Sequence, residues 1–248
     1  MQPERPGPSG LITTSWDDGH PFDARVADLL AKHGASGTFY VPSRNVEGRP
    51  VMRAADVRRL GAGFEIGGHT EDHVSLVGLA PQAAAQQIAG NKRRLEDWLG
   101  REVSGFAYVR GHHNRAVRRL VEHAGFRYAR TVRNLADSGG SDRFRMPTTI
   151  QFFAHADAIY VRNYLSGGPT PRRLALLRAV LAEEGLANRL VRVAAASLGA
   201  GRHFHLWGHS WELDEYDLWG ELDRFLGCLR QFRAGFVPNA AWWGEGVR

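Results

Sequence analysis

The sequence is poor in cysteine and in long apolar runs. Its 248 residues contain a single cysteine, Cys228, which excludes a disulfide framework within the chain and any cysteine-rich zinc site. No apolar run approaches the ~20 residues that a membrane-spanning helix needs, so we expect no membrane span. The N-terminal segment MQPERPGPSG lacks the apolar region of a secretory signal, and we therefore expect a cytoplasmic protein.

Lysine is also scarce, although the chain is basic. The formal net charge is +6, and of the 32 basic residues only Lys32 and Lys92 are lysines. The arginines are scattered along the chain, in pairs at most, whereas nucleic-acid-binding proteins usually carry a basic stripe on a recognisable module. We therefore expect no nucleic-acid partner. The length and the 43% of hydrophobic residues favour one folded domain over residues 1–248, and they do not predict an oligomeric state.

Short apolar runs alternate with helical apolar periodicities along the chain. Helical stripes are indicated between successive runs, for example in the segment that follows Pro81. Strands alternating with helices predict an α/β fold with parallel strands, and at this length a barrel is favoured over an open sheet. The segment from Leu135 to Ile150 has no clear assignment. The seven predicted strands are Leu11–Trp16, Gly37–Val41, Phe64–Ile66, Phe106–Tyr108, Arg127–Arg130, Ala158–Val161 and His203–Trp207.

Polar side chains that suit catalysis follow several of the predicted strands. An α/β barrel places its active site at the carboxyl ends of its strands, so these positions are expected to meet at one rim. The convergence of carboxylates and imidazoles at one rim is typical of a hydrolytic enzyme. The positions concerned are Asp17 and Asp18 after the first strand, His69 and His73 after the third, Arg110 to Asn114 after the fourth, and His209 after the last.

These residue types can hold a metal and move protons. His69 and His73 are four residues apart, so on a helical turn they would share a face and bind one ion. Two imidazoles and one carboxylate leave an open position on a Zn²⁺-like ion. Gly19 lets the chain turn at the strand end, so that both adjacent aspartates can reach the site. One aspartate can then bind metal while the other takes a proton from water, and a histidine can protonate the leaving amine.

Three motifs together resemble those of the polysaccharide deacetylases, carbohydrate esterase family 4 or the NodB homology domain. They are S-W-D-D-G at residues 15–19, H-T-x-x-H at 69–73 and L-x-x-H at 206–209, and the resemblance extends over about residues 11–232. It implies a distorted (β/α) barrel of about seven parallel strands. It also implies Asp17 as general base, His209 as general acid, and Asp18, His69 and His73 as metal ligands.

Two family motifs are altered or missing. The family's third motif begins with an arginine that pairs with the base, and Ala107 takes its place here. We hypothesise that Arg110, three residues further on, supplies the lost charge, and we include Arg110, Leu206 and Trp207 as residues that bind substrate or orient the base. The fourth motif, an Asp-Trp pair that holds the catalytic histidine, has no match before His209. Asp217 and Trp219 follow His209 and are weak candidates to replace it.

Several of these residues also have purely structural interpretations. Asp17 and Asp18 could cap a helix, and His69 and His73 could be loop histidines. His112 and His113 are interpreted as surface histidines rather than as a second metal site. Three aromatic residues could stack on a sugar or pack in the core; they are Trp207, Trp211 and Tyr216. The acidic residues from Glu212 to Asp223 are interpreted as a solvated helix face.

The resemblance implies removal of N-acetyl groups from an amino-sugar substrate with release of acetate. The expected cofactor is one divalent ion, Zn²⁺, with Co²⁺, Ni²⁺ and Mn²⁺ as alternatives. For a cytoplasmic protein, an acetylated sugar or a glycolipid precursor is the expected partner. Two other functions stay open. One is the hydrolysis of a non-sugar amide, ureide or cyclic imide, and the other is a catalytically inactive relative that binds sugar or metal.

Overall fold

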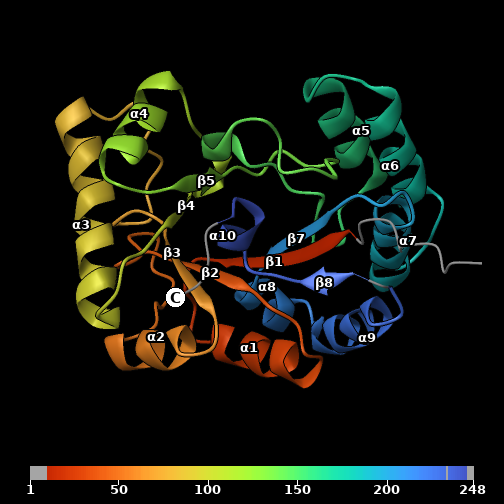
Figure 1. The fold of residues 1–248 in the computed structure, drawn as a ribbon, viewed down its shortest axis with the longest axis horizontal. Coiled ribbons are helices and arrows are strands. Elements are labelled where there is room, and N and C mark those ends of the chain that lie inside the picture. Colours follow the sequence, from red (N-terminus) through yellow and green to blue (C-terminus); the bar gives the residue numbers. More distant parts are fainter. Residues whose placement is uncertain (1–9, 233, 245–248) are drawn as a thin grey trace, which may run out of the picture.

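The computed structural model describes residues 10–232 and 234–244. Residues 1–9, on which most of the expectation about a secretory signal rests, lie outside the described residues. The described residues form one curled sheet with helices on its outside (Figure 1). The strands, in chain order, are β1 Leu11–Asp17, β2 Thr38–Val41, β3 Glu65–Gly68, β4 Gly105–Ala107, β5 Tyr128–Arg130, β6 Ile150–Gln151, β7 Phe204–His209 and β8 Gly235–Phe236.

All strand pairs are parallel, and β1 lies between β2 and β7. The order is β5-β4-β3-β2-β1-β7-β6, with the short β8 beside the start of β1. Seven parallel strands in this order form a distorted, incompletely closed (β/α) barrel, as the alternation predicts. A backbone segment partly bridges its open side, because Met146 N–H donates to Ala129 O and Thr149 N–H donates to His205 O.

Helices surround the sheet, and their apolar faces pack on it. The hydrophobic core is continuous from Ile12 to Leu229. No helix in the described part of the chain is long and apolar enough to cross a membrane. The helices are α1 Asp23–Lys32, α2 Ala54–Gly61, α3 Pro81–Leu99, α4 Arg115–His123, α5 Asp157–Ser166, α6 Pro171–Leu181, α7 Leu186–Leu198, α8 Ser210–Glu215, α9 Trp219–Leu229 and α10 Asn239–Trp242, with 3₁₀ turns at Val109–Gly111 and Arg143–Arg145.

Helix α10 covers the amino ends of the strands. Ala240 N–H donates to Glu65 at the start of β3, and Asn239 N–H donates to Thr38 at the start of β2. The Trp242 ring lies 4.6 Å from the His203 ring, just before β7. This end of the barrel is therefore filled by the chain itself, and the opposite, carboxyl end is left for a site.

The sixth strand was wrongly predicted at Ala158–Val161, which belongs to helix α5. Four apolar residues do not distinguish a strand from a helix, and here Tyr160 is buried while Val161 is exposed. The true sixth strand, Ile150–Gln151, lies at the end of the segment that had no assignment. A two-residue strand is too short to show the alternation by which strands are predicted.

Candidate active site

Asp17 and Asp18 separate at the end of β1 because the backbone turns sharply there. Asp17 is the last residue of the strand, whereas Asp18 has φ 76° and Gly19 has φ 58°. A Cβ atom at position 19 would lie 2.8 Å from Val41 Cγ1, so only glycine fits this turn. The turn directs both carboxylates into the same cavity, as the sequence predicts.

Asp18, His69 and His73 form a buried triad. Their potential ligand atoms lie within 4.8 Å of one another, and no other group of three such residues is found in the described part of the chain. Asp18 Oδ1 is 2.9 Å from His73 Nε2 and 3.5 Å from His69 Nε2. The two histidines do not share a helical turn as expected. Positive φ values at Thr70 and His73 bring the rings together in an irregular loop.

Neighbouring groups orient the triad. His69 Nδ1–H donates to Ala107 O over 2.8 Å, and this contact turns the other ring nitrogen, Nε2, toward Asp18. Trp211 Nε1–H donates to Asp18 Oδ2 over 2.9 Å, which leaves Oδ1 toward the histidines. Burial raises the pKa of Asp18, but the hydrogen bonds of both histidines and the charge of His209 outweigh it and hold this pKa well below its usual range. The carboxylate is therefore ionised.

Arg130 contacts Asp17, and Arg110 does not. Arg130 lies at the end of β5, is fully buried, and donates from Nη2 to Asp17 Oδ1. Its strand register places it directly beside Ala107 of β4, so the guanidinium absent at position 107 enters from the next strand. Arg110 is 62% exposed and pairs with Glu47. The hypothesis that Arg110 orients the base is therefore wrong, because the 3₁₀ turn carries its side chain toward Glu47.

His209 ends β7 beside Asp17 and is held by Glu212. The two strands place Asp17 and His209 in register, and His209 Nδ1 lies 2.9 Å from Glu212 Oε2. Glu212 is buried and also accepts from Gln151 Nε2 over 3.1 Å. Burial lowers the pKa of His209, but the hydrogen bond and charge of Glu212 and the charges of the two aspartates raise it to about 9. His209 is therefore protonated at neutral pH.

Glu212 was thus wrongly assigned to a solvated helix face. Helix α8 begins directly after His209, and three residues of helix bring this carboxylate back onto the imidazole. Asp217 and Trp219, the candidates to replace the missing Asp-Trp motif, are not seen to hold His209. The Trp219 Nε1–H group donates to Asp214 instead. Glu212 is therefore the described carboxylate that contacts His209, the contact expected of the missing Asp-Trp motif.

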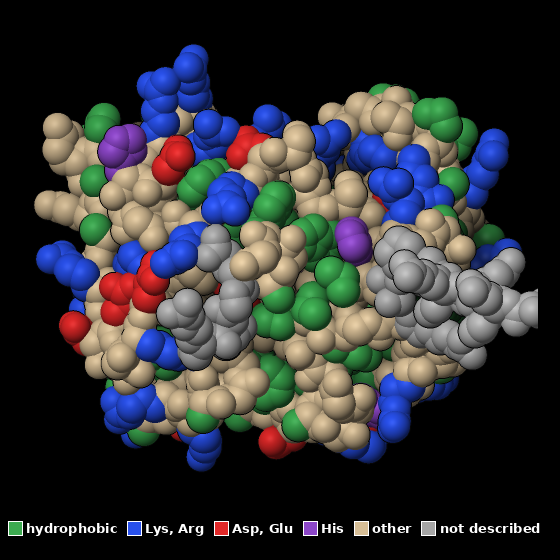
Figure 2. Space-filling view, in the orientation of Figure 1, with side chains coloured by type: hydrophobic (Ala, Val, Ile, Leu, Met, Phe, Trp, Pro, Cys, Tyr) green, Lys and Arg blue, Asp and Glu red, His purple; other side chains and the backbone are tan. Residues whose placement is uncertain are grey.

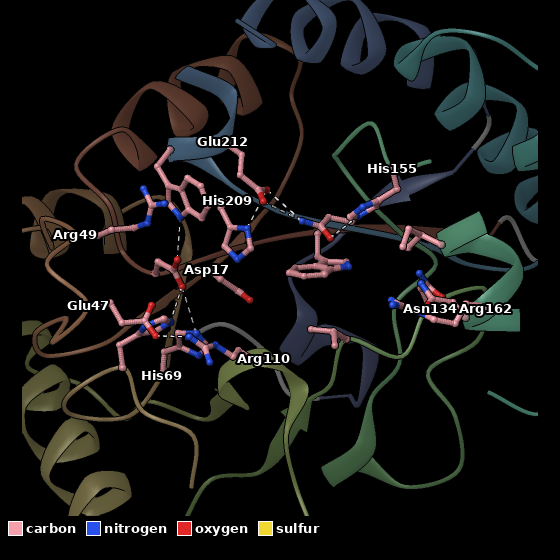
Figure 3. A pocket seen from close by; sticks show the side chains of 18 residues that line it. Asp17, Glu47, Arg49, His69, Arg110, Asn134, His155, Arg162, His209 and Glu212 are labelled. Carbon is pink, nitrogen blue, oxygen red and sulfur yellow. Dashed lines mark hydrogen bonds and ion pairs between the residues drawn. The ribbon is translucent and has the colours of Figure 1, made fainter. Parts of the chain in front are cut away.

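One cavity of about 510 Å³ joins these groups (Figure 3). It is lined by the triad, by Asp17 and His209, and by Trp207 and Trp211. Figure 3 shows His69 and Arg110 near one end of the cavity and Asn134 and Arg162 near the other. The remaining lining residues are Glu47, Arg49, Val132, Gln151, His155, Ile159, Asn163 and Glu212.

Some predicted site residues lie elsewhere. Leu206 is fully buried in the hydrophobic core and does not line the cavity, because alternate side chains of β7 point to opposite faces of the sheet. Tyr216 is exposed and packs on Phe153. His113 stacks on Tyr108, and His112 approaches Ser75, so neither joins the triad.

Sequence reasoning missed Arg130, Glu212 and Gln151. Arg130 could have been found from the sequence, because it is the last residue of a predicted strand, and polar residues at such strand ends are candidates for the active site. Glu212 had a weaker signal, because its spacing from His209 matters only if a helix starts there. Gln151 had none, because its strand was not recognised.

About half of the chain matches a known protein family. The family model for polysaccharide deacetylase matches residues 4–129, just over half of the chain. The peptidoglycan-N-acetylglucosamine deacetylase of Bacillus cereus is 27% identical over 125 residues, which are 50% of this chain and 57% of that protein. The chain spans between 25% and 57% of the length of the curated relatives that it matches.

Solved structures share the fold over nearly the whole chain. The chitin deacetylase of Colletotrichum lindemuthianum matches with a TM-score of 0.63 at 17% identity, over 97% of this chain and 90% of that one. A family 4 acetyl xylan esterase from Clostridium thermocellum, solved with a cobalt ion, matches with a TM-score of 0.59 at 18% identity, over 94% and 90%. The chain belongs to the polysaccharide deacetylase family.

Proposed function

We propose that this protein is a metal-dependent hydrolase that removes N-acetyl groups from an amino-sugar substrate and releases acetate. The observation that carries the proposal is one cavity in which a carboxylate–histidine–histidine triad faces an arginine-paired aspartate and a glutamate-paired histidine. These are the groups that hydrolysis of an amide needs: a site for a divalent ion, a base and an acid.

The triad fits a divalent metal ion. Two neutral imidazoles and one ionised carboxylate form a common donor set for Zn²⁺ with an open position, and the ring protonation of His69 leaves Nε2 free to bind. We expect Zn²⁺ at Asp18, His69 and His73. When bound there, the ion lowers the pKa of a nearby water and polarises the substrate carbonyl.

Asp17 accepts the proton of the attacking water. The water oxygen bonds to the amide carbon, and the Asp17 carboxylate takes the released proton. Arg130 holds this carboxylate in place by a direct ion pair, and the Arg130 guanidinium lies near the rings of Tyr40 and Trp207. Because both partners are buried, water does not weaken the pairing.

His209 donates a proton to the departing nitrogen. The C–N bond then breaks, and the products are acetate and an amine. A leaving amide nitrogen needs this proton, and Glu212 keeps His209 charged until it is used. The pair works as a unit, because the carboxylate both orients the ring and stabilises its charged form.

An amino sugar is the expected substrate. Trp207 and Trp211 line the cavity, and aromatic rings are well suited to the C–H faces of sugars. Two relatives are named as deacetylases of peptidoglycan N-acetylglucosamine and of chitin, and these names also support an amino-sugar substrate. An acetylated sugar and a glycolipid precursor both remain candidates, and the cytoplasmic location stays a prediction.

The first experiment measures bound metal and acetate release together. Purified protein is loaded with Zn²⁺, Co²⁺ or Ni²⁺ and assayed on N-acetylated oligosaccharides, on a monosaccharide and on non-sugar amides, with and without chelator. We expect one bound ion and chelator-sensitive acetate release. Asp17→Asn should keep the ion and lose about 10²–10⁴-fold in turnover, because only the base is removed.

The outcomes separate the three open functions. Acetate from sugars supports the proposal, whereas turnover of a non-sugar amide alone would replace it with the second function. Metal bound without turnover of any substrate would leave a binding protein. Near-normal turnover in Asp17→Asn would show that another residue is the base.

A further inference from the structure

Two further cavities adjoin the active-site cavity and extend it. The second, of about 620 Å³, shares Arg110, Val132, Asn134 and Asn163 with the first. The third, of about 420 Å³, shares His113 and Arg145 with the second. Because neighbouring cavities share lining residues, the three lie next to one another between the triad and the start of helix α4, and together we call them the basic groove.

The outer part of the basic groove is lined by cations and by no carboxylate of the described residues. Two of its arginines are neutralised from outside, Arg110 by Glu47 and Arg118 by Asp142. The other groove arginines are exposed, and no described carboxylate pairs with them. They are Arg115, Arg133, Arg145 and, in the active-site cavity, Arg162.

Exposed arginines outside the groove are often paired. Arg59 pairs with Asp56, Arg224 with Glu221, and Arg44 with Asp72. Figure 2 shows Lys and Arg side chains recurring along the edge of the molecule over α4, α5 and α6, with few acidic ones among them. Other exposed arginines, such as Arg58 and Arg178, also have no described carboxylate partner. What distinguishes the groove is that its arginines line a concave surface with no carboxylate in the lining of its outer part.

Unpaired cations in a concave surface attract anions. A cleft lined by one sign of charge concentrates field lines, and it raises the local concentration of ligands of opposite charge. Arginine in particular binds carboxylate and phosphate groups with two parallel hydrogen bonds. The groove is also lined by the neutral side chains of Asn134 and Asn163, whose amide groups can hydrogen-bond to the hydroxyl groups of a sugar.

We infer that the basic groove binds the non-reacting part of an anionic N-acetylated glycan. The acetylated sugar lies at the metal triad, and carboxylate or phosphate groups of its neighbours contact Arg133, Arg145 and Arg162. The inference rests on the proposed function and narrows its substrate class. A uronic acid residue and a diphosphate-linked sugar share this chemistry, and the experiment separates them.

The test compares matched substrates that differ in charge. The substrates are a neutral tetrasaccharide of N-acetylglucosamine, a tetrasaccharide alternating N-acetylglucosamine with glucuronic acid, and UDP-N-acetylglucosamine. We expect kcat/KM to be at least about tenfold higher for one of the two anionic substrates, mainly through KM. This advantage should shrink as salt rises, because screening weakens exposed charge pairs. The preferred anion identifies the carboxylate or the diphosphate.

Variants locate the effect in the groove. Arg133→Gln and Arg145→Gln should each lower kcat/KM for the preferred anionic substrate about fivefold, through KM, and lower it much less for the neutral one. Arg58→Gln is the matched control, since Arg58 is an exposed arginine of α2 that lines none of the three cavities. It should leave both values unchanged.

Equilibrium binding to Asp17→Asn gives a readout without turnover. The anionic oligosaccharide should bind more tightly than the neutral one, and Arg145→Gln should remove most of the difference. Acetate release with equal kcat/KM for all three substrates would overturn the inference and leave the proposed function intact. No acetate from any substrate would overturn the proposed function, and the binding data would then decide the inference alone. Equally tight binding of a DNA oligonucleotide would overturn it as well.

Discussion

The proposed metal triad and the proposed proton-transfer groups line one cavity, but they are held in place in different ways. Asp18, His69 and His73 come from residues matched by the family model, and a backbone carbonyl and neutral side chains orient them. Arg130 and Glu212 lie beyond the matched residues, and each acts through a buried charge.

This difference teaches where a family site can vary. A metal ion would need ligands of a set number and kind, so the proposed triad allows little variation in its residues. The supporting charges need only reach the right atom, and they can come from another strand or helix. Here Arg130 approaches Asp17 from β5, and Glu212 approaches His209 from α8. The motifs lost from the sequence are thus replaced in space.

The strongest test of the triad is His73→Ala. Removal of one ligand should lose the bound ion and lower acetate release by about 10³-fold, because a two-ligand site holds metal poorly. Metal content by atomic absorption and turnover are measured on the same preparation. His123→Ala, which changes an exposed histidine of α4, is the control. Wild-type metal content in His73→Ala would remove His73 from the site.

Arg130→Met tests the opposite side of the cavity. It leaves the Asp17 carboxylate buried without a partner, so the free energy of unfolding should fall by about 3–5 kcal/mol, with loss of turnover. Arg110→Ala should change the unfolding free energy by less than about 1 kcal/mol, because its ion pair is exposed. Chemical denaturation measures both values.

The double variant Asp17→Asn/Arg130→Met keeps this test informative if the single variant does not fold. With the carboxylate neutralised, much of the lost stability should return. A double variant no more stable than Arg130→Met would mean that Arg130 acts by packing and not by its charge.

Glu212→Gln should produce the smallest change, a shift of the pH profile. His209 acts as an acid, so kcat/KM falls as the pH rises through its pKa of about 9. Without the Glu212 charge this basic limb should move to lower pH, with about a tenfold loss of turnover at pH 8. The stabilisation from the pair is complete below the unfolded pKa near 6.5 and is lost as the pH rises through about 9. An unmoved basic limb, equal to that of Glu215→Gln, would contradict the role of Glu212.

Much of the fold was predictable where the pattern is long. Strand β1 was predicted over Leu11–Trp16 and ends one residue later, and helix α3 begins at Pro81, after which the helical periodicity was noted. Strand β6 was missed because two residues carry no period. Arg130 was readable as the end of a strand, but its contact with Asp17 depends on the register of β4 with β5, which local sequence does not specify.

The sequence by itself determined which candidate reactive groups meet, because parallel strands end at one rim and these groups lie at or just beyond strand ends. They are Asp17, Asp18, His69, His73 and His209. Only the tertiary structure decided which charges support them and what surrounds them. The arginines of this protein are scattered along the sequence, and the fold brings several of them from four separate segments into the basic groove. Proximity in space depends on the packing of loops and helices around the barrel, and it leaves no periodic trace in the order of residues.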